Sequence, residues 1–96
     1  MKISILLPYK ENFSPIYPGA VSLFVRDTVN ISKYKNKITI YGNTNFKERF
    51  KLKYNNIPLS MFRLQSKSKI YVNNFISIEK KNPSELIEIH NRPNYL

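Results

Sequence analysis

Apolar residues along this 96-residue chain alternate between short continuous runs and longer stretches with helical spacing. The run over residues 2–7 is almost uninterrupted, which is typical of a central strand covered on both faces. A loop over residues 9–18 contains Pro15 and Pro18, which break helices. From Gly19 to about Tyr34 the apolar spacing predicts a helix. Its expected inward stripe is Val21, Phe24, Val25 and Val29, and its expected polar face is Ser22, Arg26, Asn30 and Lys33.

The second half of the chain continues this alternation. Residues 37–41 predict a β-branched and aromatic strand that ends at a Gly-Asn turn pair. The basic stretch 44–56 fits either a short surface helix or a loop, and residues 57–62 predict a third strand, weakened by Pro58. A second helix is predicted from a cap at Ser66 or Ser68 to Pro83, followed by a fourth strand over residues 86–89. Its expected inward stripe is Tyr71, Val72, Phe75, Ile76 and Ile78.

The order of these elements predicts an α/β fold. Because crossovers between parallel strands are right-handed, we expect a single domain over residues 1–96 with a parallel sheet of about four strands in the order 3-2-1-4. Such a sheet, with flanking helices, is the Rossmann-like half of a doubly wound fold. Ligands of these sheets bind at the carboxyl ends of the strands where the order reverses, which here lies between strands one and four.

Composition excludes several classes of site. The chain has no cysteine and one histidine, which excludes disulfides, thiolate nucleophiles and cysteine-ligated metals, so no metal and no cofactor is expected. The six acidic residues are scattered, which argues against hydrolysis by a carboxylate pair. No apolar run approaches the roughly 20 residues that span a bilayer, and the first eight residues are too short for a signal peptide. The expected location is cytoplasmic, with the inner face of the membrane as a further place of attachment.

The net charge of +10 has two interpretations. It is typical of proteins that bind nucleic acid or an anionic membrane. In the stretch 44–56, basic and aromatic side chains are interleaved: Lys47, Arg49, Lys51 and Lys53 with Phe46, Phe50 and Tyr54. A free-standing basic α/β module that binds RNA or an anionic membrane surface is therefore one candidate function. However, Lys, Asn and Ile each occur 12 times, and these residues have A/T-rich codons, so a biased genome also explains the lysines. The basic stretch is then a solvated loop.

Two segments should meet at the carboxyl edge of the sheet. The first is Gly19 and Ala20 at the start of the first helix, where free N–H groups attract anions and a glycine lets backbone and ligand approach closely. The second is His90, Asn91 and Arg92 at the tip of strand four, where an imidazole, an amide and a guanidinium suit a general base or a phosphate contact. The structural alternatives are a plain helix start and a packed histidine.

Four segments carry a family resemblance: MKISILLP at residues 1–8, YPGAVSLFV at 17–25, KITIYGNT at 37–44 and ELIEIHNRP at 85–93. Together they resemble the amino-terminal domain of group-1 (family 4) glycosyltransferases of the GT-B fold, over the whole chain. The family's small pair at the first helix, which approaches the donor diphosphate, corresponds to Gly19 and Ala20, with Ala20 in place of the second glycine. The family's acidic and apolar strand ending in histidine corresponds to residues 85–90, with His90 as the candidate catalytic residue.

The resemblance implies transfer of a sugar from a nucleotide-sugar donor to an acceptor hydroxyl, with retention of configuration and without a metal. It also implies that the donor-binding domain lies beyond residue 96, so this chain would be an incomplete GT-B amino-terminal domain that is inactive alone. An unpaired fourth strand would then leave an apolar edge at Leu86, Ile87 and Ile89, through which we expect self-association.

Overall fold

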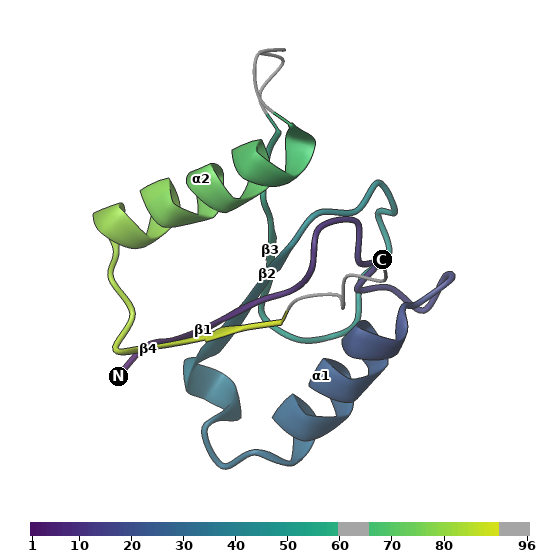
Figure 1. Ribbon diagram of the computed structural model, residues 1–96. Coiled ribbons are helices and arrows are strands. Elements are labelled where there is room, and N and C mark those ends of the chain that lie inside the picture. The colour runs from purple at the N-terminus through teal and green to yellow at the C-terminus, as the bar shows by residue number, and fades with distance from the viewer. Residues whose placement is uncertain (60–65, 91–96) are drawn as a thin grey trace.

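The computed structural model describes residues 1–59 and 66–90 and shows an α/β fold with one helix on each face of a sheet (Figure 1). The elements in chain order are β1 (Ile3–Leu6), α1 (Ala20–Ile31), the 3-10 turn η1 (Lys35–Lys37), β2 (Ile38–Gly42), β3 (Tyr54–Asn56), α2 (Lys67–Lys81) and β4 (Leu86–Ile89). Both helices lie close to where the apolar spacing predicts them.

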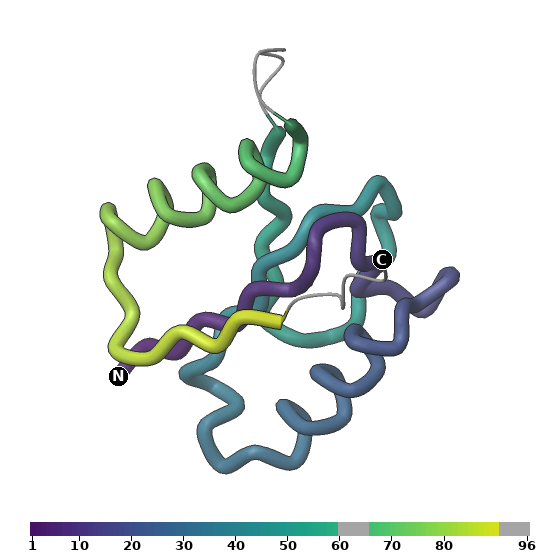
Figure 2. The backbone as a smooth tube through the Cα atoms, in the orientation of Figure 1, coloured from purple at the N-terminus to yellow at the C-terminus, as the bar shows by residue number. Residues whose placement is uncertain are grey.

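The four strands form one parallel sheet in the order β3-β2-β1-β4, which confirms the predicted topology. Ile3 of β1 pairs with Ile38 on one side and with Leu86 on the other, so segments from both ends of the chain run side by side (Figure 2). All four residues of β1 are buried, as expected for a central strand with two covered faces. All four residues of β4 are exposed, and this strand is one edge of the sheet, with β3 at the other.

Two apolar clusters hold the helices to the sheet. On the α1 face, Val25 and Val29 pack on Ile3, Ile5 and Ile40. On the other face, Tyr71 and Phe75 of α2 pack on residues from three parts of the chain: Leu6, Tyr41 and Ile57. Successive strand residues therefore pack toward α1 or toward α2. Because both faces of the sheet are covered, the central strands are almost continuously apolar in sequence.

The third strand lies at Tyr54–Asn56, so its prediction over residues 57–62 was wrong. Tyr54 stacks on Phe13 at 5.4 Å between ring centroids, which holds this segment beside β2. Pro58 has no N–H to donate to a ladder, and the chain leaves the sheet there. Residues 60–62 lie outside the described residues. The described part of the 44–56 stretch contains no helix, so of the two alternatives the loop is correct up to β3.

Helix faces also differ from the prediction. In α1, Ser22 is buried although it was expected on the polar face, whereas Phe24 is 58% exposed. In α2, Val72 and Ile76 are each 43% exposed, whereas Glu79 is buried. Apolar spacing predicts a broad stripe, but only the part of the stripe that faces the sheet becomes buried. Val72 and Ile76 lie on the flank of the stripe, on the side of β4.

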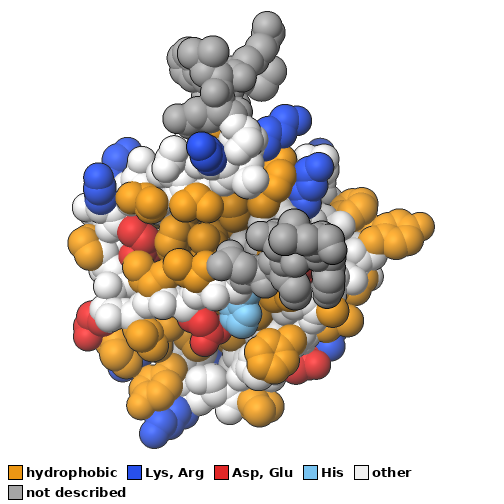
Figure 3. Space-filling model, in the orientation of Figure 1, with side chains coloured by type: hydrophobic (Ala, Val, Ile, Leu, Met, Phe, Trp, Pro, Cys, Tyr) orange, Lys and Arg blue, Asp and Glu red, His pale blue; other side chains and the backbone are white. Residues whose placement is uncertain are grey.

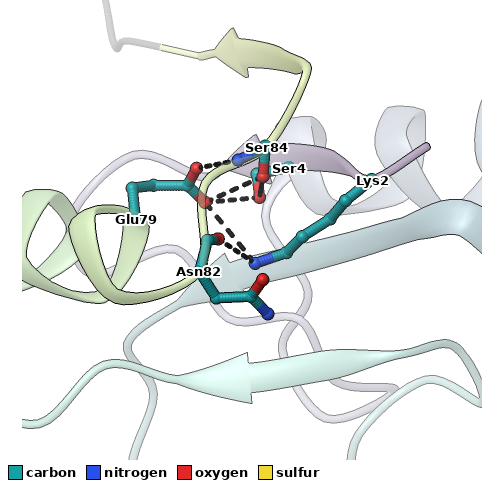
Figure 4. Close-up of polar contacts among 5 residues, drawn as sticks. All are labelled: Lys2, Ser4, Glu79, Asn82 and Ser84. Atoms are coloured by element: carbon teal, nitrogen blue, oxygen red, sulfur yellow. Dashed lines mark hydrogen bonds and ion pairs between the residues drawn. The ribbon is translucent and has the colours of Figure 1, made fainter.

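Buried Glu79 joins the end of α2 to the amino ends of β1 and β4 (Figure 4). Its carboxylate accepts hydrogen bonds from the Ser4 hydroxyl at 2.7 Å and from the Ser84 N–H at 2.9 Å. Lys2 Nζ lies 3.9 Å from the same carboxylate. Burial alone would raise the pKa of Glu79, but these hydrogen bonds and the lysine outweigh it and hold the pKa below its usual value. The cluster lies at the opposite edge from the expected ligand site, so its role is structural.

Candidate functional site

The carboxyl edge of the sheet brings the candidate residues to one side of the molecule. The loops that follow β1 and β4 leave from this edge, and both α1 and α2 begin there, because each helix connects parallel strands. The strand order reverses between β1 and β4, so the expected ligand position lies at the ends of these two strands.

The first turn of α1 already holds an anionic group of the chain itself. The buried carboxylate of Glu11 accepts a hydrogen bond from the Ser22 N–H at 2.9 Å. This interaction satisfies one of the free donors at the helix N-terminus and places negative charge at the positive end of the helix dipole. A phosphate at this turn would have to share it with Glu11.

Gly19 is required because the space beside it is occupied, and its backbone conformation does not demand a glycine. Its φ of −77° and ψ of 161° are extended backbone that any residue adopts. A Cβ at this position would lie 1.8 Å from Glu11 Oε2, so the group that approaches Gly19 closely is this carboxylate. Ala20 follows as the first helical residue and is exposed. A role of either residue in ligand binding stays a prediction.

His90 lies directly after β4, on the same face of the sheet as α1. Its Nε2 lies 2.7 Å from Glu88 Oε2, and its ring lies 6.2 Å from the ring of Phe24 in α1. Its backbone N–H donates to the Leu6 carbonyl, which fixes the residue at the end of β1. Within the described residues, Nδ1 makes no hydrogen bond. The imidazole is therefore oriented through Nε2.

The contact between Phe24 and His90 brings the two predicted segments close to each other. Phe24 lies just over one turn into α1 from Gly19 and Ala20, so its contact with His90 brings the tip of β4 to the start of that helix. Asn91 and Arg92 lie outside the described residues, and their predicted contacts are not tested.

The switch point contains a pocket whose lining residues were not identified from the sequence. The pocket has a volume of about 330 Å³ and lies between the ends of β1 and β4 and the first turns of α2. Its lining residues are Leu6, Leu7, Pro8, Tyr9, Ser68, Tyr71, Val72 and Ile89. The topology indicated where to look, but the walls come from three distant segments whose apolar residues resemble ordinary core positions.

Two of the three aromatic residues in the basic stretch, Phe50 and Tyr54, pack against the apolar core. Phe50 packs edge-on against Phe13 at 5.0 Å between ring centroids, and Arg26 lies 4.9 Å from the Phe50 centroid. Tyr54 stacks on Phe13 and lies under Arg49, and burial raises its pKa to about 12, although the Arg49 charge lowers it. Rings already covered in this way are poorly placed to stack on bases. Binding of RNA or of an anionic membrane stays a prediction.

Comparisons with known proteins found no match for this chain: no protein-family model, no curated protein and no solved structure matches it. Over residues 1–59 and 66–90, no three His, Cys, Asp or Glu side chains come together as a metal site would require. In the same part of the chain, neither helix is long and apolar enough to cross a bilayer.

Proposed function

We propose that this chain is the acceptor-side portion of a glycosyltransferase that transfers a sugar from a nucleotide-sugar to an acceptor hydroxyl. The observation that carries the proposal is the position of His90, oriented by Glu88 at the switch-point edge and in contact with the helix that begins at Ala20. The family resemblance of residues 17–25 and 85–93 supports the same assignment.

His90 acts in this proposal through Nδ1. Because Glu88 engages Nε2, a neutral imidazole donates its proton to the carboxylate and keeps an acceptor at Nδ1. A nitrogen that accepts a hydrogen bond at this position can bind or orient a hydroxyl of the acceptor substrate at the reacting centre. Glu88 is a positioning residue, since it acts through the imidazole. Asn91 and Arg92 follow His90 in the sequence and are proposed to contact the substrate.

Gly19 and Ala20 are the proposed contacts on the donor side. They can offer only backbone groups and close approach, since neither carries a polar side chain. The Glu11 carboxylate at the same turn limits the charge that this helix end has left for a diphosphate. We therefore propose that most of the diphosphate charge is bound by a second domain, and that the chain alone is inactive. The proposed location is cytoplasmic.

A first test of the proposal is the DNA that adjoins the coding segment. A continuous or neighbouring frame that encodes a second α/β domain would support it, and a gene without one would contradict it. In parallel, a calorimetric titration of the 96-residue chain with nucleotide-sugars should show no binding at millimolar concentration. A monomer that binds a nucleotide-sugar with micromolar affinity would contradict the division into two domains.

A second test concerns His90 in the protein that contains both domains. His90→Ala should lower turnover by at least about 100-fold, as expected for loss of a proton-accepting group, with little change in melting temperature. Asn30→Ala is the matched control, because Asn30 is exposed on α1 and takes no part in the site. Unchanged turnover in His90→Ala would remove this residue from the mechanism.

A further inference from the structure

The pocket at the ends of β1 and β4 is a recess with apolar walls. Leu6, Leu7 and Pro8 are buried and form its floor, and the Tyr9 and Tyr71 rings lie 5.6 Å apart at an angle of 50°. Val72 and Ile89 form opposite rims, one from α2 and one from β4, and remain 43% and 57% exposed. Hydrophobic side chains gather between these two elements on the face shown in Figure 3.

The pocket offers few polar partners. The Tyr71 hydroxyl donates its one proton to the Leu7 carbonyl, so it has no further proton to donate to a ligand. Burial raises the pKa of Tyr71 above its usual value, with further contributions from Tyr54 and Glu11, so the hydroxyl stays protonated. Among the lining side chains only Tyr9 and Ser68 carry other polar atoms. A sugar ring would lose hydrogen bonds with water here and regain few.

The size of the pocket suits a small apolar group. A volume of about 330 Å³ lies at the lower end of the range for ligand pockets, about 300 to 1,000 Å³, and equals the share of about eleven water molecules. A phenyl ring or a six-carbon chain fits this space. A second recess lies farther along α2 at Ile76 and Ile87. It is shallower and lies toward the amino ends of β1 and β4, away from the switch point.

The direction of the strand relates the pocket to His90. Ile89 and His90 are consecutive, and consecutive side chains at a strand end point to opposite faces. Ile89 lines the pocket on the α2 face, whereas His90 contacts Phe24 on the α1 face. A molecule with an apolar group in the pocket and a hydroxyl at His90 would therefore have to reach from the α2 face of the sheet to the α1 face.

We infer that this pocket holds the apolar aglycone of the acceptor, so that the acceptor is a glycoside with an aromatic or aliphatic group rather than a free sugar. The inference rests on the proposed function for the identity of the molecule as an acceptor. The affinity of the pocket for an apolar group rests only on its walls, its volume and its place at the switch point.

The test is a titration of the uniformly ¹⁵N-labelled chain with three glycosides that share one sugar: phenyl, hexyl and methyl β-glucoside. Phenyl and hexyl glucoside should bind at least tenfold more tightly than methyl glucoside and shift the amide signals of Ser68, Val72 and Ile89. A preference for one of the two apolar probes identifies the aglycone as aromatic or aliphatic. Equal affinity for all three glycosides would overturn the inference.

Two substitutions locate the binding. Val72→Trp places a large side chain in the pocket and should abolish binding of the apolar glycosides, whereas Ile76→Trp should leave it unchanged. The two positions lie one turn apart on α2 and are equally exposed, but only Val72 lines the pocket. If Val72→Trp fails to fold, Ser68→Trp fills the pocket from the exposed first turn of α2. Equal loss of binding at positions 72 and 76 would contradict the assignment.

The same probes separate this inference from the proposed function. If the two-domain protein transfers sugar equally well to methyl and phenyl glucoside, the pocket assignment fails and the function stands. If the chain binds phenyl glucoside at the pocket but the two-domain protein transfers sugar to none of the probes or related hydroxyl compounds, the proposed function fails and the pocket stands.

Discussion

Glu11 and Gly19 form a pair in which one residue explains the other. The Glu11 carboxylate caps the first turn of α1 through the Ser22 N–H, and the space it needs is available only because Gly19 has no Cβ. Helix capping by a side chain eight residues before the N-cap is not a local sequence signal, since capping motifs place the acceptor within the first turn. The contact between Glu11 and Gly19 therefore forms only because the loop over residues 9–18 folds back onto the start of α1.

The first prediction tests this pair with a double-mutant cycle. Gly19→Ala should lower the free energy of unfolding by about 1–3 kcal/mol, because the new methyl group displaces the Glu11 carboxylate. In a Glu11→Ala background the same change should be neutral or stabilising by about 0.5 kcal/mol, because the extended φ of Gly19 suits alanine. Urea denaturation of the four proteins measures the coupling. Equal costs in both backgrounds would show that the two residues are independent.

The second prediction concerns Glu79 and acid. Because the pKa of Glu79 is lower in the folded chain than in the unfolded chain, the unfolded chain binds more protons, and stability rises with pH through this range. The contribution is therefore present near neutral pH and is lost as the pH falls through the folded pKa. Glu79→Gln should cost about 1–3 kcal/mol near neutral pH, since Gln cannot replace all the accepted hydrogen bonds. Urea denaturation at successive pH values should show the difference between the two proteins shrinking below the usual glutamate pKa; a constant difference would contradict the argument.

Among the elements, α2 shows the limit of apolar periodicity. The spacing of its residues predicts a helix, which is confirmed, and a wide inward stripe, of which only Tyr71 and Phe75 are fully buried. The helix lies across β1 and β2, where Leu6 and Tyr41 receive Tyr71 and Phe75, and the flank with Val72 and Ile76 faces the free edge instead. Which part of a stripe becomes core depends on the position of the helix over the sheet.

The third prediction tests this orientation. Phe75→Ala should lower the free energy of unfolding by about 3–4 kcal/mol, because the ring is buried and meets Tyr41 edge-on at 5.3 Å. Ile76→Ala should cost less than about 1 kcal/mol, because much of this side chain already contacts water. Thermal and urea denaturation measure both. Similar costs at the two positions would mean that the helix is rotated from this orientation.

At the scale of the whole molecule, β4 is the least protected part of the sheet. Its side chains are exposed on both faces, including Leu86 and Ile89 at 58% and 57%, and its outer backbone groups face no strand among the described residues. Natural edges are usually protected by lysines, prolines or bulges, and β4 carries only Glu88 as a charge within its length. The charge of +10 opposes association at long range but leaves this edge available.

The fourth prediction follows from that edge. Sedimentation velocity of the purified chain should show dimers or larger species at about 0.1 mM, and Ile87→Lys or Ile89→Lys should shift the chain toward monomer. Ile31→Lys is the matched control, because Ile31 is 87% exposed at the end of α1, away from β4. A monomeric wild-type chain at this concentration, or equal effects of all three lysines, would contradict self-association through the edge.

The fifth prediction concerns the basic surface. Because the rings of Phe50 and Tyr54 are covered by protein, any binding of single-stranded RNA should come from lysines alone. Fluorescence anisotropy should then show weak affinity, with a Kd above about 10⁻⁵ M at physiological salt and a steep decline as salt rises. Strong binding that survives high salt and is lost in Phe46→Ala would favour the RNA-binding module instead.

The sequence by itself determined the type and order of the elements and, through them, the sheet order. A continuous apolar run, a helical period and the rule of right-handed crossovers are local or topological facts, so β1, α1, β2, α2 and β4 lie close to their predicted ranges. The same topology indicated that His90 and the start of α1 share the carboxyl edge.

Tertiary structure alone decided how these elements use their side chains. The position of β3 depends on the stacking of Tyr54 on Phe13, and the exposed flank of α2 depends on the packing of Phe75 on Tyr41. The need for glycine at position 19 depends on Glu11. In each case the partner lies outside the element concerned. The pocket beside Ile89 likewise has walls from the β1, α2 and β4 regions. Periodicity reports whether a residue faces inward, but contacts across the chain decide what it meets there, because packing depends on the shape and volume of all neighbours together.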